Sequence, residues 1–338
     1  MKDEKSFFDA MEEDINSANI SEDDRSKLIK NMLLLKEQTI NIMITGATGC
    51  GKSSTINALF NTNSKTQKEV AKVGVGVDPE TMDIQKYELN NLVLWDSPGL
   101  GDGKEADNRH AKNIINKLHE RDKNGDLLID LVLVILDGSS RDLGTSYELI
   151  NTVIIPNLGE DKENRILVAI NQADMAMKGK HWLLEENKPD PILQKFLDEK
   201  AESVKKRIKE GTGIDVDPIY YSAGYKEEGQ EQQRPYNLSK LLFYIVKYTP
   251  KKKRLSIVDN INTDQNMWRD NDELKDYSKE IKKSFEETFN ECVDKGGEIG
   301  GTIGGIFGET GEKIGRVVGK VVGGAVGAVK GFFRSIFG

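Results

Sequence analysis

Apolar runs of strand length alternate with segments of helical periodicity through the middle of the chain. The runs are rich in Ile, Val and Leu, and each ends at or just before a polar residue or a glycine. They cover residues 40–45, 83–89, 92–96, 131–137, 165–171 and 219–223. Alternation of this kind predicts an α/β fold, in which a largely parallel sheet is covered on both faces by helices.

Two of these runs are too close together for a crossover connection. Only Asn90 and Asn91 separate residues 83–89 from residues 92–96. Parallel neighbours need a connection of a dozen or more residues, whereas a two-residue turn joins antiparallel strands. We therefore expect a hairpin here, with one antiparallel strand in the sheet.

The flanking segments have helical patterns. Residues 6–38 predict two helices, of which the second begins at Ser21. Pro250 and the basic run 251–254 mark a boundary, and an apolar helix face follows at Leu274, Tyr277, Ile281, Phe285, Phe289 and Val293. The predicted division is an N-terminal helical segment (1–38), a central domain (39–249), a helical region (250–295) and a glycine-rich tail (296–338).

Composition narrows the choice of partners and compartment. The 338-residue chain has a net charge of -8, and its first 38 residues hold 10 acidic against 6 basic side chains. This charge gives no general positive electrostatic potential of the kind that attracts nucleic acids, and we expect no DNA partner. The two cysteines, Cys50 and Cys292, are far apart in sequence, and no apolar signal segment follows Met1. A reducing, cytoplasmic location is therefore expected.

A phosphate-binding motif lies between the first strand and a helix. The stretch GATGCGKSST, residues 46–55, has the spacing of glycine, four residues, glycine, lysine and serine. Its glycines let consecutive N–H groups point into one concavity, to which the following helix adds its positive N-terminal dipole. Lys52 would reach the outer phosphates of a nucleotide, and Ser53 would bind a magnesium ion that bridges them. Cys50 is best explained as a small residue in a tight loop.

Three further strings follow later strands and indicate which base is bound. Asp174, in NQAD, can accept from both the ring N–H and the exocyclic amine of guanine, a pair of donors that adenine lacks. In DSPG, Asp96 would hold magnesium through water and the Gly99 N–H would contact the terminal phosphate. YSAG would offer backbone groups at Ser222 and Ala223 to the guanine carbonyl. All three lie where an open α/β sheet binds its ligands.

These four strings, in this order, resemble the motifs of the translation-factor-related GTPases, nearest the Era-like and dynamin-like branches, over about residues 39–249. The phosphate loop is most similar to those of immunity-related and chloroplast-import-receptor GTPases. The resemblance implies a G domain with a mixed six-stranded, mostly parallel sheet, bound GTP or GDP with Mg2+, and slow hydrolysis of GTP.

The resemblance also implies a threonine in the first switch loop that contacts magnesium and the terminal phosphate. Thr81 is the best candidate, with Thr62 and Thr66 as rivals. The expected phosphate-binding residues are Gly46, Ala47, Thr48, Gly49, Cys50, Gly51, Lys52, Ser53, Ser54 and Gly99. The expected guanine-binding residues are Asn171, Gln172, Asp174, Ser222 and Ala223, and the expected magnesium-binding residues are Ser53, Thr81 and Asp96.

The source of the catalytic group is left open. Leu100 follows Gly99 where small regulatory GTPases carry a water-orienting glutamine. Arg109, His110 and Arg141 could each stabilise charge, within one chain or across a dimer of G domains, but a solvated or structural role is the simpler interpretation. Leu100 also keeps open the alternative of a GTP-dependent scaffold that does not hydrolyse.

The glycine-rich tail, residues 296–338, shows a separate pattern of charged and apolar positions. On a helical wheel of residues 312–337, the charged side chains occupy one arc and the apolar side chains, including Phe332 and Phe333, lie opposite. This pattern is typical of a helix that lies in a membrane interface, although a tail folded onto the protein's own helices remains an alternative. The longest charge-free run, residues 321–329, falls short of a membrane span.

These observations favour a cytoplasmic GTPase switch that attaches peripherally to the cytoplasmic face of a membrane through residues 296–338. A ribosome- or RNA-associated assembly GTPase is the alternative, and it would require a compact basic module that is not visible beyond residues 251–254.

Overall fold

Six strands form one mixed sheet at the centre of the computed structural model, which describes residues 6–17, 21–60, 70, 83–99, 103–225, 233–294, 333–334 and 336–337. The strands are β1 (Ile40–Gly46), β2 (Gln85–Leu89), β3 (Leu92–Asp96), β4 (Leu131–Asp137), β5 (Ile166–Asn171) and β8 (Ile219–Tyr220), in the order β2-β3-β1-β4-β5-β8. The predicted α/β fold with a mixed six-stranded sheet is confirmed.

The hairpin predicted across Asn90 and Asn91 is also confirmed. Strand β2 pairs antiparallel with β3, from Gln85 opposite Asp96 to Leu89 opposite Leu92. All the other neighbours in this sheet are parallel. The carboxyl ends of β1, β3, β4, β5 and β8 therefore meet at one edge of the sheet.

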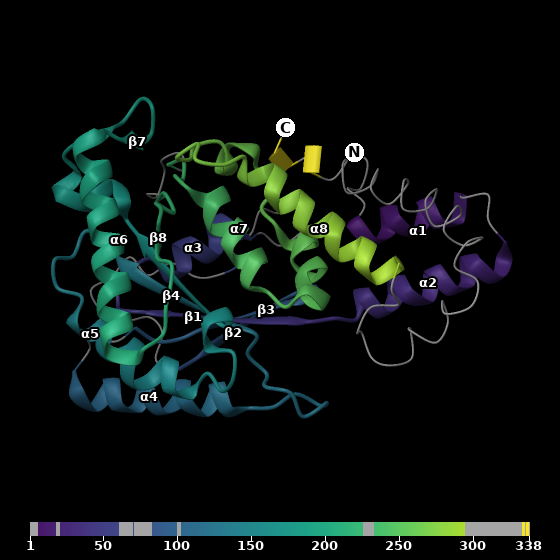
Figure 1. Ribbon diagram of the computed structural model, residues 1–338, viewed down its shortest axis with the longest axis horizontal. Helices are drawn as coiled ribbons and strands as arrows, with labels where there is room; N and C mark the ends of the chain where they lie inside the picture. The colour runs from purple at the N-terminus through teal and green to yellow at the C-terminus, as the bar shows by residue number, and fades with distance from the viewer. Residues whose placement is uncertain are drawn as a thin grey trace.

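Helices cover both faces of the sheet, with α4 on one side and α3 and α7 on the other (Figure 1). The α-helices are α1 (Phe7–Ser17), α2 (Glu22–Lys36), α3 (Lys52–Leu59), α4 (Lys104–His119), α5 (Gly144–Glu148), α6 (Pro191–Thr212), α7 (Leu238–Tyr248) and α8 (Tyr277–Asp294). Shorter helical turns are η1 (Leu149–Ile154), η2 (Ile155–Asn157), η3 (Lys162–Asn164), η4 (Ala173–Gly179), η5 (Lys251–Asn260) and η6 (Gln265–Trp268). The two predicted N-terminal helices are confirmed.

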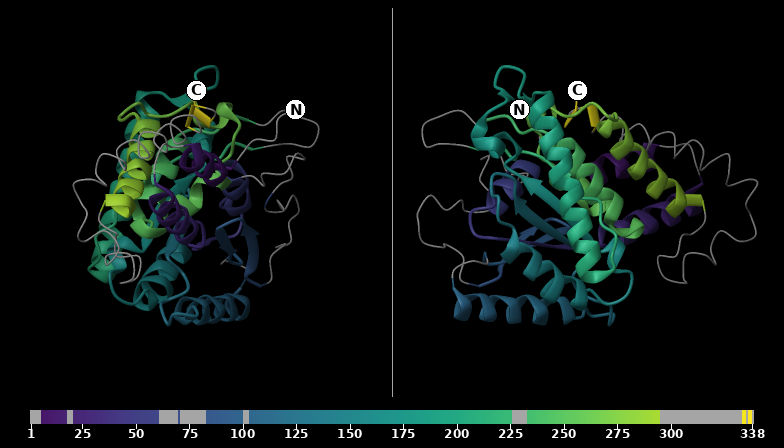
Figure 2. Two further views of the ribbon diagram at one scale, coloured as in Figure 1. Left: turned by 90° about the vertical axis from the view of Figure 1, so that its right-hand side faces the viewer. Right: turned by 60° about the vertical axis from the view of Figure 1, so that its left-hand side comes forward.

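Successive side chains of the central strands point to opposite faces of the sheet, so each face of the sheet has its own hydrophobic core. In β4, Leu131, Leu133 and Ile135 join the core formed with α1, α2, α3, α7 and α8. The intervening residues Val132 and Val134 join the core formed with α4, η1 and α6. Figure 2 shows these layers from two further sides. Strands buried on both faces explain why their sequences are continuously apolar.

The chain beyond Pro250 packs on the same core as the central strands. Leu255, Ile257 and Val258 of η5 are buried, and they belong to the cluster that contains Ile42 of β1. Near the start of η5, Lys253 Nζ lies 2.8 Å from Asp130 Oδ1, with both side chains largely buried. The hydrophobic core therefore continues through the predicted boundary at 250.

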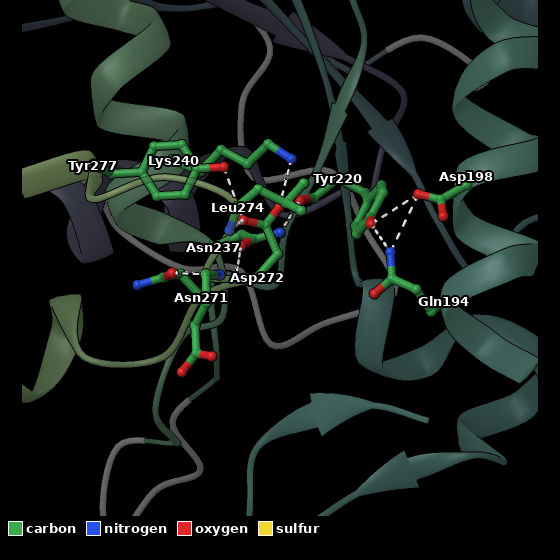
Figure 3. Close-up of polar contacts among 10 residues, drawn as sticks. Gln194, Asp198, Tyr220, Asn237, Lys240, Asn271, Asp272, Leu274 and Tyr277 are labelled. Atoms are coloured by element: carbon green, nitrogen blue, oxygen red, sulfur yellow. Dashed lines mark hydrogen bonds and ion pairs between the residues drawn. The ribbon is translucent and has the colours of Figure 1, made fainter. Parts of the chain in front are cut away.

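A buried polar network attaches the start of α8 to α7 and β8 (Figure 3). Lys240 Nζ lies 2.6 Å from Asp272 Oδ2, and the Tyr277 hydroxyl donates to Asp272 Oδ1 at 2.8 Å. Asn237 accepts from the Asp272 N–H at 2.8 Å and donates to the Tyr220 carbonyl at 3.0 Å. Because every group here is paired, the network fixes α8 to the strand that precedes the YSAG string.

The apolar face predicted for α8 is correct in part. Tyr277, Ile281 and Phe285 are buried, but Leu274 is 74% exposed and precedes the helix. The prediction is wrong at Leu274 because Asp276 caps the helix, accepting from the Lys279 N–H at 3.0 Å. The side chains of Phe289 and Val293 lie outside the described residues. A short hairpin of β6 (Trp182–Leu183) and β7 (Lys188–Pro189) was not predicted.

Candidate nucleotide-binding site

The loop between β1 and α3 is held in a conformation that depends on glycine. Gly51 has φ of 87°, and a Cβ there would lie 2.3 Å from Asn171 Nδ2. A Cβ on Gly99 would lie 2.2 Å from Thr48 Oγ1. Two loops from distant parts of the sequence therefore approach residues 46–54 so closely that side chains would separate them.

Lys52 begins α3 and turns back over this loop. Its ammonium donates to the carbonyls of Gly46 at 3.3 Å and Ala47 at 3.1 Å. A cation at the mouth of a loop of this kind adds to the positive end of the helix, so the place favours an anion such as phosphate. Cys50 is fully buried in the same loop, and burial raises the pKa of its thiol.

Asp96, at the end of β3, is a buried carboxylate close to Lys52 and Ser53. Burial raises its pKa to about 6, although the Lys52 charge and a hydrogen bond from the Ser53 hydroxyl act in the opposite direction. Its Oδ1 has no hydrogen-bond partner within the described part of the chain. An unpaired carboxylate oxygen beside a hydroxyl provides the oxygen donors that Mg2+ prefers, so these residues fit such an ion.

The NQAD string reaches the phosphate loop directly. Asn171 Nδ2 donates to the Cys50 carbonyl at 3.0 Å, and Gln172 Nε2 donates to the Gly49 carbonyl at 2.8 Å. Asn171 Oδ1 accepts from the Ala223 N–H at 3.0 Å. Asn171 thus holds three loops together, from the ends of β1, β5 and β8.

Asp174 lies in the first turn of η4 and is half-buried. The loop reaches it through Gln172, whose φ of 59° turns the chain after β5. The Ala173 N–H donates to the Tyr221 carbonyl at 3.1 Å, which places this turn beside the YSAG string. Ser222 is buried and forms an antiparallel bridge with Tyr236.

Sequence reasoning missed a buried cross-link behind the site. The hydroxyls of Thr55, in α3, and Tyr221, just after β8, lie 2.6 Å apart. Tyr221 is fully buried, and Thr55 Oγ1 also donates to the Gly51 carbonyl at 2.8 Å. Both residues stand inside the quoted strings, but nothing in the sequence indicates that two such side chains meet 166 positions apart.

The residues considered for catalysis have different surroundings. His110 is buried in α4, and its Nδ1 donates to the Gly99 carbonyl at 3.1 Å, behind the DSPG loop. Arg109 and Arg141 are exposed. Thr81, its rivals Thr62 and Thr66, and Leu100 lie outside the described residues. The structure assigns no catalytic group among them.

Fold and site together define a P-loop GTPase domain. A model of the family described as 50S ribosome-binding GTPase matches residues 41–172, which run from β1 through the phosphate loop to Gln172. This part of the chain therefore has the fold and motifs of a G domain of the P-loop class.

Several known proteins are similar to parts of the chain. Escherichia coli (strain K12) protein YfjP is 31% identical over 146 residues, 43% of this chain and 45% of that protein. Mouse interferon-inducible GTPase 1 is 32% identical over 91 residues, 26% of this chain and 21% of the relative. The matches thus span less than half the length of these relatives.

Solved structures with related folds include Toc33 from Arabidopsis thaliana in complex with GDP and Mg2+. It is 16% identical, with a TM-score of 0.39, and the match covers 74% of this chain and 99% of Toc33. The bacterial dynamin GTPase LeoA from ETEC is 14% identical, with a TM-score of 0.38, and covers 84% of this chain and 44% of LeoA.

Proposed function

We propose that the protein binds GTP with Mg2+ at this site and hydrolyses it slowly to GDP as a conformational switch. The observation that carries the proposal is the junction at Asn171, where the phosphate loop, the NQAD loop and the YSAG loop are hydrogen-bonded together. A nucleotide with its phosphates at Lys52 and its base at Asp174 would span these loops.

In this proposal the backbone of residues 46–54 and the Lys52 ammonium bind the phosphates, with Gly99 at the terminal phosphate. The Asp174 carboxylate accepts from two guanine N–H groups, and Asn171 and Gln172 position its loop. The Ala223 N–H already donates to Asn171 Oδ1, so Ala223 would contribute to the base site mainly by holding Asn171.

Ser53 and Asp96 are the described residues that would hold Mg2+, with Thr81 as the third expected group. The bound ion would neutralise charge that develops on the phosphates. Of these residues, Asp96 is the one whose charge costs free energy without the ion, because it is buried with an unpaired oxygen.

Hydrolysis is tested by phosphate release from Mg·GTP at several protein concentrations, with Lys52→Ala as the inactive control. We expect a slow rate above the buffer background that Lys52→Ala abolishes. A rate per molecule that rises with concentration would support a dimer through the G domain. The exposed apolar side chains of Met175, Leu184 and Ile192, just beyond the base loop, are consistent with such a dimer. A rate at background would favour the non-hydrolysing scaffold.

We further propose that residues 296–338 attach the protein to a membrane surface. The support is the segregation of basic and apolar positions in the sequence of 312–337. In the part of the chain that the structure describes, no helix is both long and apolar enough to cross a bilayer. Flotation with anionic vesicles should require the tail, and equal flotation of the full chain and a chain lacking 296–338 would remove this claim.

A further inference from the structure

The last described residues of the chain pack against its own helices. Phe333 is 5% exposed and Ile336 is fully buried, within the core that contains α7 and α8. The ring of Phe337 lies 5.5 Å from that of Trp268 in η6, and the ring of Phe333 lies 5.6 Å from that of Phe285 in α8. This short segment lies beside α8 in Figures 1 and 2.

Trp268 and Phe285 form the tail-docking surface, and both are held firmly. The Trp268 indole N–H donates to the Asn262 carbonyl at 2.8 Å, which fixes the ring in place. Phe285 is fully buried in α8, and the Asp272 network anchors that helix at its start. Phe333 and Phe337 also stack on each other at 5.4 Å, so the docked segment presents a stacked aromatic pair to this surface.

The docked side chains belong to the face of the tail that would enter lipid. On the helical wheel of 312–337, Phe333 and Ile336 lie on the apolar side, whereas Arg334 lies among the charged residues. In the structure Arg334 is exposed while Phe333 and Ile336 are buried. The same apolar side chains cannot be buried in the protein and in a bilayer at once.

We infer that docking of the C-terminal segment on Trp268 and Phe285 and binding of that segment to an anionic lipid surface exclude each other. The docked state is the one that does not bind lipid, and release of residues 333–337 exposes the attachment face. The lipid part of this inference rests on the proposed function, but the docking itself does not.

The tail-docking surface is also in contact with the phosphate-loop helix. The Asn262 N–H donates to the Leu59 carbonyl at 2.9 Å, and Asn262 Nδ2 donates to the Ala58 carbonyl at 3.1 Å. Asn262 therefore binds the last turn of α3 on one side and Trp268 on the other. A displacement at the end of α3 would therefore act on a residue that holds Trp268 in the tail-docking surface.

The docking is measured on the full chain by 19F NMR with 5-fluorotryptophan. The chain has three tryptophans, and Trp268→Phe assigns the resonance of Trp268. Deletion of residues 333–338 gives the undocked position of that resonance. We expect the full chain to differ from the deletion variant at Trp268 and not at Trp95 or Trp182. Coincident Trp268 resonances would show that the segment does not dock, and would overturn the inference.

Competition with lipid is then tested by adding vesicles of phosphatidylcholine and phosphatidylserine. We expect the Trp268 resonance of the full chain to move toward the undocked position. Phe285→Leu, which removes one aromatic contact from the surface and leaves the tail intact, should float about threefold more protein than the wild type. Ile336→Asp should float less, and Leu274→Ala, at an exposed position outside the surface, is the matched control.

Two contrary outcomes separate the inference from the proposed function. If the full chain and the chain lacking 296–338 float equally, membrane attachment fails and the inference fails with it. If the full chain floats better but Trp268 stays at its docked position with vesicles, attachment stands and the exclusion alone is overturned. A thermal unfolding curve close to that of the wild type shows that Phe285→Leu is folded.

Discussion

At the scale of single residues, the buried carboxylate of Asp96 shows how a binding site costs stability. Its pKa of about 6 lies above the ordinary value of 3.8, so the folded protein holds this proton more tightly than the unfolded chain does. Stability is therefore lost as the pH rises from about 4 to about 6, and the ionised group costs about 3 kcal/mol above that range. A bound magnesium ion would offset this cost.

Asp96→Asn should therefore stabilise the magnesium-free protein while weakening Mg·GTP binding. We expect a gain of about 3 kcal/mol at pH 7.5 and about half of that at pH 5, because the wild-type group is mostly protonated at the lower pH. Affinity for Mg·GTP should fall about tenfold or more. Denaturant unfolding in EDTA measures the first effect, with the exposed Asp126→Asn as control. A loss of stability at pH 7.5 would contradict the assignment.

The Thr55–Tyr221 cross-link gives a second prediction at this scale. Tyr221→Phe removes only the hydroxyl that lies 2.6 Å from Thr55 Oγ1, so we expect a loss of about 1 kcal/mol in stability. Because the bond joins α3 to the base loops, nucleotide dissociation should quicken about fivefold. A double-mutant cycle with Thr55→Val should give a coupling energy of about 1 kcal/mol. Unchanged dissociation would limit the bond to a structural role.

The sequence predicts glycines and motif residues better than their supporting partners. The spacing of Gly46, Gly51 and Lys52 indicates a tight loop after a strand because few other arrangements use that pattern. The 2.6 Å contact of Thr55 with Tyr221 depends on how two distant elements pack, and a buried hydroxyl leaves no periodic signal.

At the scale of elements, one buried ion pair contributes to the attachment of α8. Asp272→Asn would leave the Lys240 ammonium, whose side chain is 12% exposed, without its anionic partner. We expect a loss of about 3 kcal/mol in the free energy of unfolding, together with faster hydrogen exchange in α8. Glu287→Gln, which alters an exposed pair with Lys283 on the same helix, is the matched control. A loss no larger than that of the control would contradict this account of α8.

The sequence predicts the elements that have a strong hydrophobic pattern. It does not predict element boundaries that depend on a local cap, or elements that depend on tertiary contacts. The predicted strand 131–137 coincides with β4, and the predicted strand 165–171 matches β5 except at Arg165, because burial on both faces makes these strands continuously apolar. Leu274 matches the spacing of the α8 face, but the Asp276 cap starts the helix after it. The two-residue strands β6 and β7 are too short to produce a pattern.

At the scale of the whole molecule, the G domain and the helices that follow it share one core. Trp268 and Phe285, which hold the end of the tail, come from the segment beyond Pro250. Asn262 connects the same region to α3, the helix that carries Lys52 and Ser53. A nucleotide at the phosphate loop would contact the start of α3, and Asn262 joins the end of α3 to the surface that holds the tail. Any effect of the nucleotide on tail docking must be matched by an equal effect of docking on nucleotide affinity.

The central claim is that guanine is bound at Asp174 while its phosphates lie at Lys52. Titration of the wild type and Asp174→Asn with fluorescent analogues of Mg·GTP and Mg·xanthosine triphosphate tests it most directly. Xanthine has a carbonyl in place of the exocyclic amine, and an asparagine amide can donate to that carbonyl. We predict that the wild type prefers GTP and that Asp174→Asn prefers xanthosine triphosphate. An unchanged preference for GTP in the variant, or no binding of either nucleotide by the wild type, would contradict the claim.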